Sequence, residues 1–116
     1  MVLSSEMKKV VLQHIRELKE IEGTQVKEEW LEDRAVLSAI RNARMVECVF
    51  IESGRSCAQS RRMDEYYDVL EQGIKLNIVV PQAWLSKEIA RMKRVKGEGR
   101  FAITGYGEEI KTQPMI

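Results

Sequence analysis

The hydrophobic residues near the start of the chain recur at helical spacing. Met7, Val11 and Leu18 are four and seven positions apart, and mostly charged residues fill the positions between them. Serines just before this stripe can cap the first turn, and Gly23 can adopt the left-handed conformation that ends many helices. The pattern predicts a helix over about residues 5–22.

A second helical pattern occupies residues 26–44, which contain no glycine or proline. Trp30, Leu37 and Ile40 would share one side of a helix. Acidic residues fall early in this stretch and arginines fall late, which is the order that the helix dipole favours. We expect either one long helix or two short helices split near Asp33.

Alternating patterns further along the chain predict strands. Residues 45–53 and 75–80 alternate between two sides and are rich in β-branched residues. Residues 100–104 also alternate, and the Gly-Tyr-Gly sequence at 105–107 is typical of a turn. We therefore expect residues 108–112 to return as the second arm of a hairpin.

Two further helices complete the predicted fold. Residues 58–72 carry apolar residues at helical spacing, and Pro81 suits the first position of a fourth helix that continues to Val95. The predicted fold class is α+β: a single small domain over residues 1–116, with about four helices and a small, mainly antiparallel sheet. Both tryptophans lie four positions after a valine and directly before a leucine. This echo indicates a weak internal duplication, about residues 5–56 and 58–112.

The composition is that of a soluble globular domain. The chain has 116 residues, of which 44% are hydrophobic and 32% charged, and its formal net charge is +1. The longest aliphatic run, residues 78–80, is too short to cross a bilayer, and the first residues do not resemble a signal peptide. Two cysteines are too few for a disulfide scaffold. We expect a cytoplasmic protein with no membrane partner.

The near-neutral total hides a separation of charge. Residues 81–100 hold six basic and two acidic side chains, whereas residues 17–33 hold seven acidic and two basic ones. Lysine and arginine bind phosphates with release of counterions, and a helix fits the major groove of DNA. The predicted nucleic-acid-binding residues are Trp84, Lys87, Arg91, Lys93, Arg94, Lys96 and Arg100. In the alternative interpretation, the cations gather at a helix C-terminus because the dipole favours them there, and the tryptophan belongs to the core.

Two short resemblances agree with a DNA-binding function. The stretch from Lys75 to Leu85 resembles the strand and first helix of a ribbon-helix-helix repressor. The C-terminal half resembles a winged helix, in which a basic helix precedes a hairpin. Each resemblance implies DNA binding, and each covers less than half of the chain, so we assign no family.

The leading hypothesis is a small non-enzymatic regulator that binds DNA or RNA. The competing hypothesis is a protein–protein adaptor or a homodimer, because tyrosines bury large areas at interfaces while their hydroxyls stay in water. The candidate interface residues of the third helix are Met63, Tyr66, Tyr67 and Leu70.

No set of residues predicts catalysis, a metal or a cofactor. The only histidine, His14, lies on the apolar stripe of the first helix, and neither Cys48 nor Cys57 belongs to a catalytic or zinc-binding signature. The Gly-Glu-Gly sequence at 97–99 follows a helix and precedes a strand, the reverse of the order in a dinucleotide-binding motif. The acidic residues at 28–33 could act as acid–base groups or metal ligands, or meet the basic helix of a second copy, but a solvated helix N-terminus accounts for them equally well.

Overall fold

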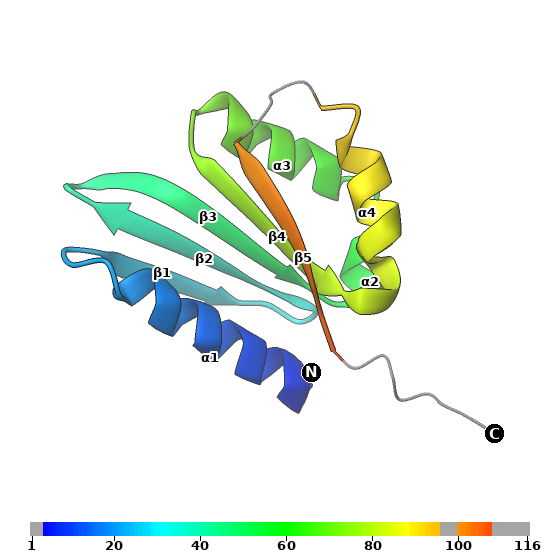
Figure 1. Ribbon diagram of the computed structural model, residues 1–116, viewed down its shortest axis with the longest axis horizontal. Helices are drawn as coiled ribbons and strands as arrows, with labels where there is room; N and C mark the ends of the chain where they lie inside the picture. The colour runs from blue at the N-terminus through cyan, green and yellow to red at the C-terminus, as the bar shows by residue number, and fades with distance from the viewer. Residues whose placement is uncertain (1–3, 96–99, 108–116) are drawn as a thin grey trace.

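The computed structural model describes residues 4–95 and 100–107. Its elements, in chain order, are α1 (Ser5–Lys19), β1 (Gln25–Trp30), β2 (Arg34–Arg41), β3 (Arg44–Glu52), α2 (Gly54–Cys57), α3 (Arg62–Glu71), β4 (Lys75–Pro81), η1 (Gln82–Trp84), α4 (Leu85–Met92) and β5 (Phe101–Tyr106). They form a single α+β domain (Figure 1).

The strands form one five-stranded mixed sheet in the order β1-β2-β3-β4-β5. The first three strands form an antiparallel meander, whereas β4 runs parallel to β3 and β5 runs parallel to β4. The prediction of a small, mainly antiparallel sheet is therefore wrong. Helices join β3 to β4 and β4 to β5, and such a crossover returns the chain to the same end of the sheet, which makes the joined strands parallel.

The helices cover the two faces of the sheet unequally. On one face α1 packs over the meander, and the core there includes Val11, Leu37, Val49 and Ile51. On the other face α2, α3 and α4 pack over β3, β4 and β5, and the core there includes Phe50, Tyr66, Leu76 and Met92. Figure 1 shows α1 beside β1 and β2, with α3 and α4 over the other half of the sheet. Each helical layer thus covers about half of the sheet.

The predicted helix over residues 26–44 is instead the hairpin of β1 and β2 with the turn into β3. Ala35, Leu37 and Ala39 are buried on the side of α1, and the residues between them are half-buried on the other side. Because apolar residues occupy both sides of this inner strand, the sequence loses the alternation of period two that marks a strand.

Other predicted elements agree more closely with the structure. The predicted strands 45–53 and 75–80 correspond to β3 and β4, and the first predicted helix corresponds to α1. Residues 105 and 106 continue β5 and are not a turn. The predicted return arm at 108–112 lies outside the described residues.

The structure differs from both families that the sequence resembles. β4 has a neighbouring strand on each side, so it cannot pair with the same strand of a second copy as a ribbon-helix-helix strand does. The strand after α4 pairs in parallel with β4, where a winged helix would have a hairpin. The internal duplication stays a prediction.

The turn between β2 and β3 allows a test of the hairpin that these two strands form. Asn42 and Ala43 both have positive φ, 54° and 64°, as the two central residues of a type I′ turn require. Ala43 is strained there because its β-carbon crowds the backbone. We expect Ala43→Gly to raise the free energy of unfolding by about 0.5–1 kcal/mol, measured by urea denaturation. As a control, Ala90→Gly in the exposed face of α4 should lower it by about 1 kcal/mol. A loss of stability with Ala43→Gly would contradict this turn geometry.

Candidate nucleic-acid interface

Helix α4 turns a narrow buried side toward the sheet. Glu88 and Met92, one helical turn apart, are buried, and Leu85 packs against the same core. The helical spacing of Leu85, Ile89 and Met92 in the sequence predicts one apolar stripe, but the side chain of Ile89 is 41% exposed. The solvent side of the helix therefore includes most of the predicted cations.

Four of the predicted nucleic-acid-binding residues are exposed cations: Lys87, Lys93, Arg94 and Arg100. None of the four takes part in the ion pairs found among residues 4–95 and 100–107. Their charges therefore remain available to a dissolved anion. Lys96 lies outside the described residues.

Arg91 behaves differently because its guanidinium is turned toward the chain's own groups. Its Nη1 donates to the carbonyl of Cys57 at 3.2 Å, and its Nη2 lies 3.2 Å from the carboxylate of Glu88. Because its guanidinium is half-buried and turned toward Glu88 and Cys57, Arg91 contributes little to an electropositive surface. The spacing of three residues places Glu88 and Arg91 on one side of the helix, but it cannot show that Glu88 is buried.

Trp84 lies at the opposite end of α4 from Arg94. The residue is half-buried, and a β-carbon at Gly54 would come within 3.1 Å of its Nε1. Lys87 lies over its ring, with Nζ 4.8 Å from the ring centre. Ten helical residues span about 15 Å, so Trp84 and Arg94 do not form one compact site.

The C-terminal end of α4 lies near the end of the sheet where β4 and β5 begin (Figure 1). The amide of Leu76 donates to the carbonyl of Arg100 at 3.0 Å, which places Arg100 beside Lys75 on neighbouring strands. Lys75 is exposed, and the sequence reasoning missed it because it counted Lys75 only as a strand residue.

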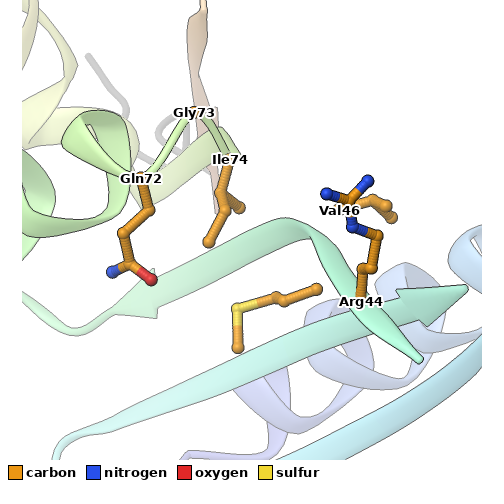
Figure 2. A pocket seen from close by; sticks show the side chains of 6 residues that line it. Arg44, Val46, Gln72, Gly73 and Ile74 are labelled. Atoms are coloured by element: carbon orange, nitrogen blue, oxygen red, sulfur yellow. The ribbon is translucent and has the colours of Figure 1, made fainter.

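A pocket of about 480 Å³ opens at this end of the sheet. Its lining residues are Arg44, Met45, Val46, Gln72, Gly73 and Ile74. Figure 2 shows that the side chains of Gln72 and Ile74 come from the turn between α3 and β4, and that Arg44 comes from the start of β3. The sequence could not predict this pocket, because its two walls are far apart along the chain.

A buried polar cluster lies at the other end of β3, around the carboxylate of Glu52. Arg34 donates to it through Nε at 2.9 Å and Nη2 at 2.6 Å, and the hydroxyls of Ser56 and Tyr66 each donate at 2.5 Å. Burial opposes the charge on Arg34, but its bonds to Glu52 and Glu65 hold the pKa above the usual value. Burial, together with the charge of Glu52, also raises the pKa of Tyr66. With four donors on one carboxylate, this cluster is a structural clamp.

The candidate interface residues of α3 separate into two groups. Tyr66 is buried and bonded to Glu52, and Met63 and Leu70 pack against the same core. Tyr67 is 43% exposed and is the one residue of the four with a large solvent-facing surface. A homodimer stays a prediction.

The residues weighed for catalysis and metal binding do not come together. Cys48 and Cys57 are buried free thiols, and burial raises their pKa values to about 11 and about 12, so both are protonated at neutral pH. His14 lies 3.8 Å from Glu17 on α1. Within the described residues, no three potential metal-ligating side chains form a group.

Comparison with known proteins found no relative of this chain. No family model, no curated protein and no solved structure matches the chain. Among the described helices, none is long and apolar enough to cross a membrane. The fold defines the protein as an α+β domain.

The clamp around Glu52 predicts a large effect from one substitution. Arg34→Ala would leave a buried carboxylate without its cation, and breaking such a pair costs about 3–5 kcal/mol. We expect this loss in the free energy of unfolding, measured by urea denaturation. Arg55→Ala, a nearby exposed arginine, serves as the control and should change it by less than about 0.5 kcal/mol. Equal effects of the two substitutions would contradict the clamp.

Glu88 predicts a pH-dependent stability. Burial raises its pKa above the ordinary value of 4.5; the charge of Arg91 opposes the rise and the charge of Glu52 reinforces it. Because the folded state holds the proton more tightly, stability contributed by this group is lost as the pH rises from 4.5 through the raised pKa. We expect Glu88→Gln to gain stability relative to the wild type over this range, measured by denaturation between about pH 4 and about pH 8. Glu71→Gln, on an exposed site, should show no such trend, and a pH-independent difference for Glu88→Gln would disprove the argument.

Proposed function

We propose that this protein is a non-enzymatic nucleic-acid-binding protein, and that it holds the phosphate backbone at the end of the sheet where β4 and β5 begin. We call this region the basic end and define it by two pairs of cations: Lys75 and Arg100 where β4 and β5 begin, and Lys93 and Arg94 just after α4. The observation that carries the proposal is the exposure of these cations without a carboxylate partner among the described residues.

Physical reasons favour a polyanion as the ligand. Each lysine or arginine that neutralises a phosphate releases condensed counterions, which gives binding energy without any sequence-specific contact. A single small anion would engage one or two of these side chains, whereas a nucleic-acid backbone repeats its charges and can contact all of them. The chain's near-neutral total does not prevent this, because seven of its eighteen acidic residues lie within residues 17–33, between the last turn of α1 and the turn after β1.

The structure narrows the set of residues that the sequence suggested. Arg91 is paired with Glu88, and Trp84 packs against the start of α2, so neither belongs to the proposed surface. Lys87 extends the surface along α4 toward Trp84. The hairpin expected to contact DNA is not part of the proposal, because β5 pairs in parallel with β4.

The adaptor hypothesis has less support from the geometry. Of its four interface residues, Tyr66 is buried in the chain's own core and only Tyr67 is largely exposed. Self-association and a cytoplasmic location stay predictions of the sequence.

The proposal is tested by titrating fluorescently labelled oligonucleotides with protein at several salt concentrations. We expect affinity to fall steeply with salt, and Arg94→Ala with Arg100→Ala to reduce the slope of log K against log salt by about two. The matched control replaces two exposed lysines of α1, Lys8→Ala with Lys9→Ala, and should leave the slope unchanged. Absence of salt-dependent binding by the wild type, or equal effects of the two double variants, would overturn the proposal.

A further inference from the structure

We infer that the pocket beside the basic end receives an unpaired nucleobase, so that the protein prefers single-stranded nucleic acid to a duplex. This inference deepens the proposed function and rests on it. The residues that line the pocket are Arg44, Met45 and Val46 on one side, and Gln72, Gly73 and Ile74 on the other.

The register of the sheet creates the pocket. Pairing between β3 and β4 begins at Glu47 and Lys75, so residues 44–46 extend beyond the start of β4. Gly73, with φ of 76°, turns the chain sharply just before β4 and closes the opposite side of the gap. One wall is the start of β3, and the other is the turn between α3 and β4, in which the amide of Gly73 donates to the carbonyl of Leu70 and the amide of Ile74 to that of Val69. A pocket built this way is formed before a ligand arrives.

The size and lining of the pocket suit a flat heterocycle. Its volume of about 480 Å³ lies in the range of small-molecule sites. Met45 and Ile74 provide apolar surface for the face of a ring, while the side chain of Val46 packs on the α1 side of the sheet. Gln72 donates one amide hydrogen to the carbonyl of Asp68 at 3.1 Å, which holds the side chain in place. No other hydrogen bond among the described residues uses its second N–H or its oxygen, and the edge of a base needs such a donor and acceptor side by side.

Two arginines, Arg44 and Arg100, lie beside the pocket, and Arg100 also belongs to the basic end. Arg44 lines the pocket, and its planar guanidinium can stack on a base or pair with a phosphate. Arg100 borders it, because a β-carbon on Gly73 would lie 3.5 Å from its Nη1. A strand whose phosphates lie on Arg100 and Lys75 would thus have a nucleotide at the mouth of the pocket.

This arrangement discriminates between single strands and duplexes. In a duplex the bases are stacked and paired, and the edges exposed in the grooves cannot enter a pocket without unpairing. In a single strand every base can turn outward, and each favourable base contact strengthens binding. The basic end would hold both forms through their phosphates, and the pocket would add affinity only for the unpaired form.

The test compares a single strand with a duplex of the same length at one salt concentration. The single-stranded probes are short labelled oligothymidylate and oligouridylate, which separate DNA from RNA, and an oligothymidylate with abasic sites. The pocket variant is Met45→Ala with Gln72→Ala, which keeps every charge. Both side chains are exposed, so the variant should fold, and its melting temperature verifies this. The matched control is Leu12→Ala with Gln25→Ala, two exposed side chains elsewhere.

We expect the wild type to bind at least one of the two intact single strands about tenfold more tightly than the duplex. The pocket variant should lose this advantage while its affinity for the duplex and its salt dependence stay unchanged, and the abasic strand should bind the wild type no better than the duplex does. Salt-dependent binding with equal affinity for single strand and duplex would overturn the pocket inference but leave the proposed function intact. An unchanged preference in the pocket variant would also overturn it. Absence of binding to every probe would overturn the proposed function and this inference with it.

Discussion

The buried carboxylate of Glu52 is the constraint on which the arrangement of this protein depends. An isolated charge inside a protein costs several kcal/mol, so the chain must bring hydrogen-bond donors to it from several elements. Arg34 comes from β2, Ser56 from α2 and Tyr66 from α3. The hydroxyl of Tyr106 on β5 donates to the main-chain carbonyl of Glu52 at 2.8 Å. The side chain of Glu52 therefore joins β2 to α2 and α3, and its main-chain carbonyl joins β3 to β5.

This clamp has consequences at the far end of the molecule. It holds the start of α3 against β3, and α3 then leads to the turn at Gly73 and into β4. The turn forms one wall of the pocket and lies beside Arg100. The proposed binding surface is thus built on elements whose positions are set by a buried polar cluster at the opposite end of the sheet. A rigid scaffold of this kind positions surface cations without requiring them to interact with one another.

The charged residues show how far sequence reasoning reaches. The concentration of cations in residues 81–100 and of acids in residues 17–33 is visible from composition. Helical spacing correctly separates Met92 from Lys87 and Arg94, but it misplaces Ile89. It allows Arg91 to pair with Glu88, three residues earlier, but cannot show that Glu88 is buried. Lys75 and Arg44 join this region through strand pairing and a hairpin, which bring together residues that are distant along the chain.

Local pattern by itself determined α1, β3, β4 and the helix after Pro81, because each is an amphipathic or β-branched segment bounded by glycine, proline or a turn. The tertiary structure decided the rest. Residues 26–44 contain good helix-forming spacing, but they form strands because pairing in the sheet satisfies their backbone groups and buries one side of β2 beneath α1, while β1 stays mostly exposed. The parallel order of β3, β4 and β5 and the pocket beside them follow from contacts across the sheet, which no local spacing of residues encodes.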